Sequence, residues 1–289
     1  MNGIIFYNFG NSCITRLLVS LYTLRKVYTG PVTLMLAKDD ANNIKLSKQL
    51  NKLNITVQWF DLEKVKRNTK SAIKPALFKE SIYDNTIMCD ADLIFIKPID
   101  ELFDQIEQNG TVLTHFMGWY TNGRIMSRRL KILEKLFDVD QMKKVYEHNP
   151  AINIGVMGIS KEKGGKFLRK WEQVTKKLAG KFIADEIAAH VYIWYDHVIV
   201  GETYNQSGKF ANKNELISNH IIHLHGSSHT NPLRNSSRLW WASLGSFYDS
   251  NLVEDAEYWQ QFDSGVMETF KTHPNIIIDC QKEYCIDNL

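Results

Sequence analysis

The chain has 289 residues, of which 44% are hydrophobic and 23% charged, as is usual for a globular protein. Its formal net charge is only +3, so composition does not demand a nucleic-acid partner. This length suits one large α/β domain, or one domain with an elaborated C-terminal part.

We expect neither a membrane span nor a signal peptide. Its apolar runs fall short of the ~18 residues that a span requires, and the first predicted strand begins at Gly3, which leaves no room for the apolar part of a cleaved signal. The four cysteines lack the paired spacing of zinc ligands. We therefore expect a reducing compartment, the cytoplasm of a bacterium or of the host cell of a virus.

The first part of the chain alternates short apolar runs with segments of helical periodicity. The predicted strands are Ile4–Tyr7, Val32–Leu36 and Ile55–Phe60; the predicted helices are Cys13–Tyr28, capped by Ser12, and Asn42–Leu50. Such alternation predicts a Rossmann-like α/β fold with a mostly parallel central sheet flanked by helices.

Two aspartates, Asp90 and Asp92, lie between apolar segments in the middle of the chain. The predicted strand Thr86–Cys89 precedes them and the apolar run Leu93–Ile96 follows. Carboxylates beside buried strands are costly unless a cation neutralises them. A hard divalent cation does so through oxygen ligands and recruits phosphate. The pair therefore predicts a metal site for a nucleotide diphosphate compound.

The second part of the chain continues the alternation. Predicted helices are Ala76–Tyr83, one from Pro98, Leu130–Tyr146, Phe167–Leu178, Ile183–Trp194, Arg238–Phe247 and Glu254–Phe270; predicted strands are Thr111–His115, Ala151–Ile159 and His220–Gly226. A second D-x-D segment, Asp138-Val139-Asp140, lies among charged residues, and we expect it to be a solvated helix end that caps a helix before Gln141.

Five short motifs follow one another along the chain. They are Lys74-Pro75-Ala76-Leu77-Phe78, Asp90-Ala91-Asp92, Asn153-Ile154-Gly155-Val156, Ala184-Asp185-Glu186 and His223-Leu224-His225-Gly226. Their order resembles nucleotide-sugar-dependent glycosyltransferases of the GT-A fold, and is most similar to the glycogenin-like and bacterial galactosyl- and glucosyltransferase group. The resemblance implies a catalytic domain over residues 1–230. The helical residues 231–289 are expected to form a C-terminal extension packed on the same domain.

The resemblance also implies a set of metal ligands. Asp90 and Asp92 would hold Mn²⁺ or Mg²⁺ against the diphosphate of a donor sugar nucleotide, expected to be UDP-linked, with Asp90 also near the ribose. The third ligand would be His223 of an H-x-x-G segment that ends at Gly226. His225 alternates with His223 and faces the same side of the strand, so the choice between the two stays open.

Further residues match positions that contact the donor in that family. Lys74 would reach the donor, Asn153 would hydrogen-bond its sugar, and Gly155 would allow the strand to pass close by. Asp185 would bind donor or acceptor hydroxyls, a task that suits a carboxylate, and its neighbour Glu186 is the alternative. Asn153, Asp185 and Glu186 are therefore the candidate catalytic residues.

The nucleoside end of the donor is implied to lie at the first strand, against Tyr7, Asn8 and Asn11. The chain departs from the family after the H-x-x-G segment, where a lysine that contacts the diphosphate is usual and is missing here. We expect His229 or Arg234 to take its place, or a shorter acceptor loop to close the site.

Three other functions remain open. A DNA- or protein-modifying glycosyltransferase of viral or phage type is suggested by the basic segments Lys64–Lys74 and Arg124–Lys131, so the acceptor is a glycan, a protein or a nucleic acid. A sugar nucleotidyltransferase would need a glycine-rich basic loop after the first strand, whereas Asn8–Ser12 holds one glycine and no basic residue. The third is a non-catalytic binder of sugar nucleotides.

Overall fold

The computed structural model describes most of the chain, and the chain divides into two compact units. The described residues are 1–8, 10–37, 41–61, 73–115, 124–147, 152–181, 183–195, 198–201, 204–207, 212–225, 228–252 and 256–284. The first unit comprises Met1–Gly3, Leu62–Met88 and Glu101–Asn205, and the second comprises Ile4–Asp61, Cys89–Asp100 and Gln206–Leu289.

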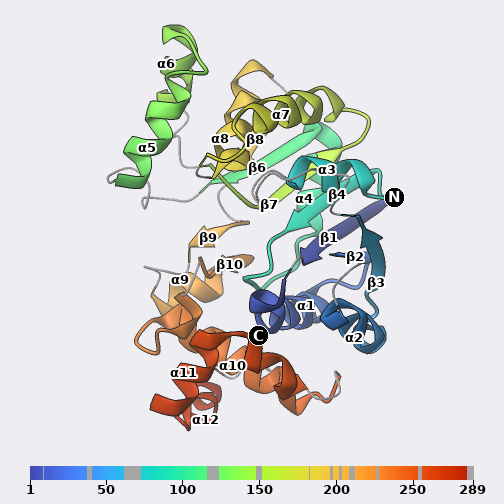
Figure 1. Cartoon of the computed structure of the whole chain (residues 1–289), viewed down its shortest axis with the longest axis vertical. Coiled ribbons are helices and arrows are strands. Elements are labelled where there is room, and N and C mark those ends of the chain that lie inside the picture. The colour runs from blue at the N-terminus through green and yellow to red at the C-terminus, as the bar shows by residue number, and fades with distance from the viewer. Residues whose placement is uncertain are drawn as a thin grey trace. The chain divides into compact units, whose positions relative to one another are not determined.

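The main sheet has seven strands in the order β3-β2-β1-β4-β7-β6-β8 (Figure 1). They are β1 Asn2–Asn8, β2 Val32–Ala37, β3 Thr56–Phe60, β4 Asn85–Cys89, β6 Thr111–His115, β7 Ile152–Ser160 and β8 Val198–Gly201. β1 pairs with β2, β2 with β3 and β6 with β8 in parallel, whereas β6 and β7 are antiparallel. This confirms the mostly parallel α/β sheet predicted from the sequence.

In the second unit, β1 to β3 are accompanied by α1 (Ile14–Val27) and α2 (Ala41–Gln49). All six residues of β2 are buried, as expected for a strand covered on both faces. A small second sheet has the order β5-β10-β9, formed by β5 Leu93–Phe95, β10 Ile221–His223 and β9 Gln206–Ser207. β10 runs antiparallel to β5 and parallel to β9.

The end of the chain is helical and belongs to the second unit. It contains α9 Lys213–Ser218, α10 Asn235–Asp249, the 3-10 helix η7 Ala256–Phe262, α11 Ser264–Thr272 and α12 Ile276–Glu283. α10 packs on α1, where the rings of Tyr22 and Phe247 lie 5.6 Å apart. Arg238 of α10 forms an ion pair with Glu283 of α12. The boundary at residue 230 remains a prediction.

The first unit surrounds β4, β7, β6 and β8 with helices. They are α3 Lys74–Glu80, α4 Asp100–Asn109 (from its second residue), α5 Arg124–Leu133, α6 Val139–Glu147, α7 Gly165–Lys177, α8 Ala184–Ala188 and the 3-10 helix η5 Ala189–Trp194. Gly158 of β7 packs closely under α4, and a Cβ there would lie 2.2 Å from Cδ1 of Ile106, so the isoleucine side chain would have to shift. The buried Trp171 of α7 packs edge-on against Phe78 of α3.

Several predicted helices were wrong in extent. Leu130–Tyr146 is two helices, because Asp138 starts α6: its carboxylate accepts from the Gln141 amide at 2.9 Å, and the Gln141 side chain accepts from the Asp138 amide at 3.2 Å. The N-cap expected within Asp138–Asp140 is thereby confirmed, and Asp138 is the residue that makes the capping bond. Ile183–Trp194 is α8 followed by η5, and Glu254–Phe270 is divided at Asp263.

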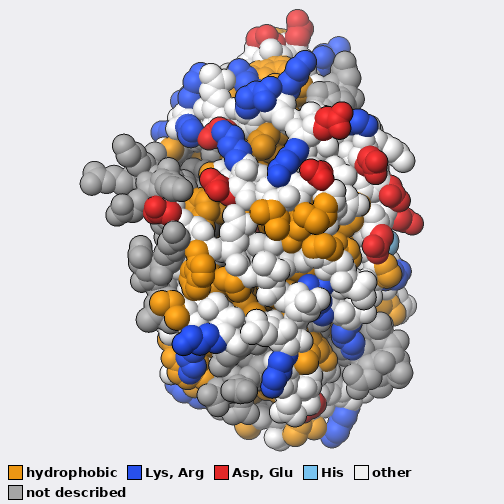
Figure 2. All heavy atoms as spheres, turned by 90° about the vertical axis from the view of Figure 1, so that its right-hand side faces the viewer, with side chains coloured by type: hydrophobic (Ala, Val, Ile, Leu, Met, Phe, Trp, Pro, Cys, Tyr) orange, Lys and Arg blue, Asp and Glu red, His pale blue; other side chains and the backbone are white. Residues whose placement is uncertain are grey.

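The Ser12 cap was also wrong. Ser12 lies within a 3-10 turn, Asn11–Cys13, and Cys13 takes the N-cap position of α1 without a side-chain capping bond. None of the described helices is both long and apolar enough to cross a membrane. Figure 2 shows one face of the molecule, where Lys and Arg side chains gather around exposed hydrophobic ones in the upper part.

Candidate functional site

The turn that carries the two aspartates is anchored by Ser20 of α1. The buried Ser20 hydroxyl lies 2.8 Å from the carbonyl oxygen of Ala91 and 2.6 Å from that of Leu93, and it accepts from the Leu93 amide at 3.0 Å. These contacts fix the backbone on both sides of Asp92. Sequence analysis missed Ser20, which has no motif of its own.

β10 brings the histidine to this turn. His223 pairs with Leu93 across the small sheet, and the Leu224 amide donates to the Asp92 carbonyl oxygen at 2.9 Å. Nε2 of the buried His223 then lies 3.1 Å from Oδ1 of Asp92. Asp90, Asp92 and His223 each offer one ligand atom, and these atoms lie within 4.8 Å of one another. Two carboxylates and an imidazole can share one divalent cation at such spacing.

The electrostatics of the turn keep Asp92 ionised. Burial works to raise the pKa of Asp92, but His223, through its charge and its hydrogen bond, with further contributions from His225 and Arg16, outweighs burial and holds this pKa well below its usual 3.8. The rings of His223 and His225 are 3.9 Å apart. His225 is thus close to the cluster, although the group of three ligand atoms includes His223.

Of the residues predicted to bind the nucleoside, Tyr7 contacts the acidic pair. Its hydroxyl donates to Oδ1 of Asp90 at 2.8 Å. Asn8 is buried and donates to the Asn43 side chain of α2 at 3.0 Å. The Asn11 side chain and Gly226 lie outside the described residues.

His229 is held by the C-terminal helices. It is 2% exposed, and its Nε2 lies 3.0 Å from Oδ2 of Asp263. Asp263 also caps α11 and lies 3.3 Å from Nε of Arg16. Burial works to raise the pKa of Asp263, but the hydrogen bond and charge of His229 together with Arg16 lower it. Arg234 occupies the N-cap position of α10.

In the first unit, a buried network surrounds Glu186. Arg129 is fully buried; it donates to Glu186 and to the Ile152 carbonyl oxygen, both at 2.6 Å. The Asn153 amide donates to the other Glu186 oxygen at 2.7 Å. The side-chain oxygen Oδ1 of Asn153 in turn accepts from the Gly155 backbone amide and from the Asn205 side chain, both at 2.8 Å. Arg129 and Asn205 were not anticipated.

Lys74 and Asp185 lie in the same unit. Lys74 is 5% exposed and donates to the Ile154 carbonyl oxygen at 3.1 Å. Asp185 is buried and accepts from the Glu186 amide at 3.0 Å. Ile183, just before α8, has a left-handed backbone with φ of 44°, which is strained for a β-branched residue and is typical of functional sites.

The predicted residues therefore fall into two clusters. Tyr7, Asp90, Asp92 and His223 come together in the second unit. Asn153, Gly155 and Glu186 are linked in the first unit, with Lys74 and Asp185 bonded to their immediate neighbours.

No protein-family model and no curated protein matches this chain. Solved structures do. The bifunctional glycosyltransferase WbbM aligns with a TM-score of 0.59 at 13% identity, over 91% of this chain and 51% of that chain. The galactosyltransferase LgtC, solved with donor and acceptor sugar analogues, aligns with a TM-score of 0.53 at 13% identity, over 91% and 95%. The chain has the GT-A fold.

A third GT-A structure, the glycosyltransferase GlyE from Streptococcus pneumoniae, aligns with a TM-score of 0.52 at 12% identity, over 86% of this chain and 64% of that chain. This chain spans about half the length of WbbM but nearly all of LgtC. The GT-A fold predicted from the five motifs is confirmed.

Proposed function

We propose that this chain is a metal-dependent glycosyltransferase. It would move a hexose from a nucleotide diphosphate sugar, with UDP as the expected leaving group, to a hydroxyl acceptor. The observation that carries the proposal is the meeting of Asp90, Asp92 and His223 within 4.8 Å, in a chain with the GT-A fold.

The donor atoms suit Mn²⁺ or Mg²⁺. Carboxylate oxygens are preferred by both ions, and an imidazole favours Mn²⁺. When bound, the cation would neutralise the charge that grows on the departing diphosphate. Tyr7 orients the Asp90 carboxylate, and His223 keeps Asp92 deprotonated. Both carboxylates are therefore prepared as ligands.

The first-unit cluster supports a role in binding sugar hydroxyls. Glu186 and Asn205 fix the Asn153 amide from both sides, and preorganised polar groups of this kind favour one orientation of a ligand. We propose that Asn153, Asp185 and Glu186 bind donor or acceptor hydroxyls, and that Lys74 lies near the donor. We also propose a cytoplasmic location, in keeping with the scattered spacing of the four cysteines.

The test is Asp92→Asn, which keeps the shape of the side chain and removes its charge. Mn²⁺ affinity, measured by calorimetry, should fall by ~100-fold or more, and UDP release from UDP-sugars should be lost. Asp140→Asn is the matched control, because Asp140 belongs to the second, exposed D-x-D pair. Wild-type Mn²⁺ affinity and turnover in Asp92→Asn would refute the proposal.

The same assay separates the alternatives. A nucleotidyltransferase would release pyrophosphate from UTP and a sugar phosphate, and a non-catalytic binder would bind UDP-sugar without releasing UDP. Screening UDP-sugars with and without Mn²⁺ by thermal shift would identify the donor, because a ligand of the native state raises the melting temperature.

A further inference from the structure

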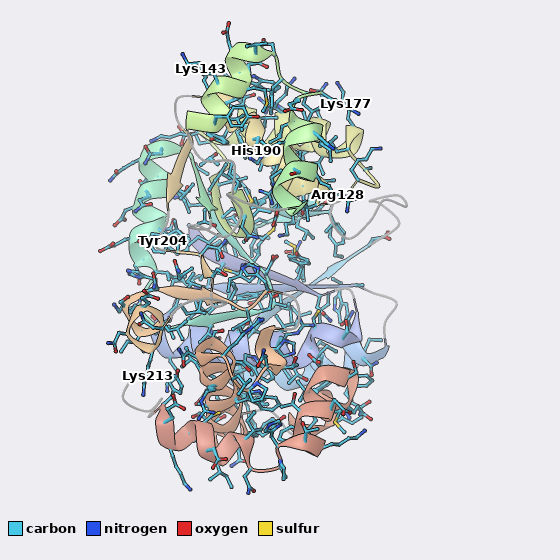
Figure 3. All side chains as sticks on the ribbon, turned by 90° about the vertical axis from the view of Figure 1, so that its left-hand side faces the viewer. Arg128, Lys143, Lys177, His190, Tyr204 and Lys213 are labelled. Carbon is cyan, nitrogen blue, oxygen red and sulfur yellow. The ribbon has the colours of Figure 1, made fainter. Side chains whose placement is uncertain are left out.

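Positive charge is concentrated in one stretch of the first unit. Residues 124–181 hold 15 Lys and Arg and 6 Asp and Glu, whereas the rest of the chain holds 20 and 26. The stretch forms α5, α6, β7 and α7. Arg128 of α5, Lys143 of α6 and Lys177 of α7 are exposed members of this set (Figure 3). The small net charge of the whole chain conceals this asymmetry.

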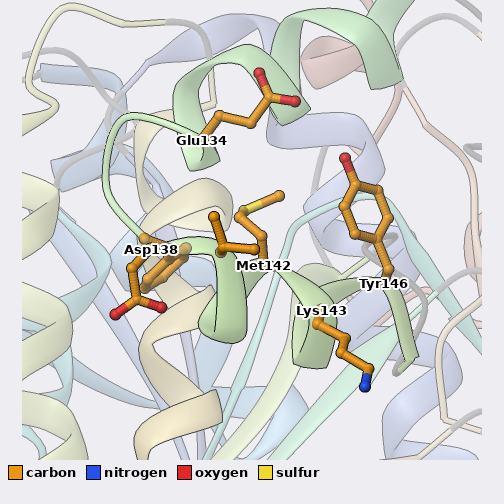
Figure 4. A pocket seen from close by; sticks show the side chains of 7 residues that line it. Glu134, Asp138, Met142, Lys143 and Tyr146 are labelled. Atoms are coloured by element: carbon orange, nitrogen blue, oxygen red, sulfur yellow. The ribbon is translucent and has the colours of Figure 1, made fainter.

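The same region has an apolar groove along α6. A cavity of about 780 Å³ is lined by Phe137, Val139, Met142 and Tyr146, with Lys143 beside them (Figure 4). Val139 is 85% exposed and Tyr146 53% exposed. Large apolar side chains this exposed are usual where a protein meets a partner or a membrane.

An aromatic pair links the wall of the groove to η5. Phe137 packs edge-on against Trp194 of η5, with ring centroids 5.3 Å apart. Trp194 is itself 36% exposed, and Nζ of Lys170 lies 4.8 Å from the centre of its ring. Exposed Trp and Tyr rings flanked by lysines are characteristic of surfaces that sit at the membrane–water interface.

We propose that α5, α6, η5 and α7 form a docking surface for an anionic lipid membrane. Val139, Tyr146 and Trp194 enter the headgroup region, while Lys143, Lys170 and the exposed cations around them pair with lipid phosphates. The groove itself is lined by Glu134, Asp138 and Lys143, and the excess of positive charge comes from the stretch 124–181 around it, which holds 15 Lys and Arg against 6 Asp and Glu. A nucleic acid would use the cations but not the exposed aliphatic side chain of Val139, so a membrane fits better.

The experiment is co-sedimentation of the full chain with phosphatidylcholine vesicles, with and without phosphatidylglycerol. We expect binding only to the anionic vesicles, weakened by salt because the pairing is screened. Lys143→Glu/Lys170→Glu should lower the partition coefficient by at least about fivefold per charge. Val139→Ser/Tyr146→Ser should also lower it, while the dependence on salt persists.

The control is Lys48→Glu/Lys282→Glu, which makes the same charge change at exposed lysines of the second unit and should bind like wild type. Circular dichroism checks the fold of each variant. Equal binding of both lysine variants, or equal binding to neutral vesicles, would overturn the proposal. So would salt-dependent binding of duplex DNA without vesicle binding, which would assign the surface to nucleic acid.

This proposal is independent of the proposed catalytic function. Asp92→Asn removes a predicted metal ligand of the second unit and should sediment with anionic vesicles as wild type does. A wild-type chain that binds anionic vesicles but transfers no sugar would reject the proposed transfer reaction and leave the docking surface standing. A wild-type chain that transfers sugar but does not bind the vesicles would reject the docking surface and leave the transfer reaction standing.

Discussion

The hydroxyl of Ser20 is the side-chain group that fixes the acidic turn most directly. It bonds backbone atoms on both sides of Asp92 while lying fully buried in α1. Groups that orient metal ligands affect binding nearly as much as the ligands themselves. The geometry of the predicted cation site thus depends on a helix that offers no ligand to it.

We predict that Ser20→Ala weakens both the fold and the site. Losing a buried hydroxyl whose partners stay buried costs about 1–3 kcal/mol, and Mn²⁺ affinity should fall ~10–100-fold. Urea unfolding and calorimetry measure the two effects. The control is Ser243→Ala, a buried serine bonded within α10 to Leu239, which should lose stability but not Mn²⁺ affinity. A loss of affinity in both variants would contradict a specific role for Ser20.

The lowered pKa of Asp263 predicts an acid-dependent loss of stability. A carboxyl whose folded pKa lies below 3.8 stabilises the fold at higher pH, and the contribution disappears as pH falls through 3.8 towards the folded value. Asp263→Asn should therefore be less stable than wild type at neutral pH, and the gap should narrow in acid. Urea midpoints across this range test it; a constant gap would show that the charge is unimportant.

Among the elements, the main-sheet strands of five or more residues were predictable, because each is a mainly apolar run in the sequence. β9, two residues long, is too short to show a pattern, and β8 was missed. The predicted helix ends were wrong where a capping bond starts a new helix although the apolar periodicity of the sequence continues, as between Asp138 and Gln141. The antiparallel pairing of β10 with β5 was not predictable, because register between distant segments is not encoded locally.

The candidate site likewise divides into residues that the local sequence predicted and residues that it did not. Asp90, Asp92 and His223 could be proposed because each belongs to a short motif. Arg129, Ser20 and Asp263 could not, since their partners lie 57, 71 and 34 residues away along the chain. Local sequence shows which residues have suitable chemistry, whereas the fold decides which of them are held in place.

Where α5 contacts α8, we predict that Arg129→Met strongly destabilises the first unit. It leaves the Glu186 carboxylate without its buried cation, a change that costs about 3–5 kcal/mol. Arg129→Met/Glu186→Gln should recover part of the loss, because the remaining amide carries no charge. Arg128→Met, at the exposed neighbour on α5, should change stability by less than about 0.5 kcal/mol. The free energy of unfolding in denaturant measures all three variants. If the double variant recovers no stability, the unpaired Glu186 charge is not the cause of the loss.

Across the whole molecule, the three predicted metal ligands belong to the second unit and the Glu186 network to the first. Mn²⁺ should therefore slow hydrogen exchange at Leu93 and Leu224, whose amides bond Ser20 and Asp92, since binding stabilises the state it selects. The Gly155 amide, bonded to Asn153, should exchange unchanged. Protection confined to Gly155 would contradict the assigned site.

The second unit is drawn from three separate stretches of the chain, the last of which is Gln206–Leu289. This discontinuity of the second unit has a consequence during translation. A ribosome delivers the aspartate pair early but His223 and Asp263 only near the end, and domains whose parts are far apart in sequence fold late. A nascent chain halted before this last stretch would expose two aspartates with no imidazole beside them, so premature termination should yield a product unable to retain manganese.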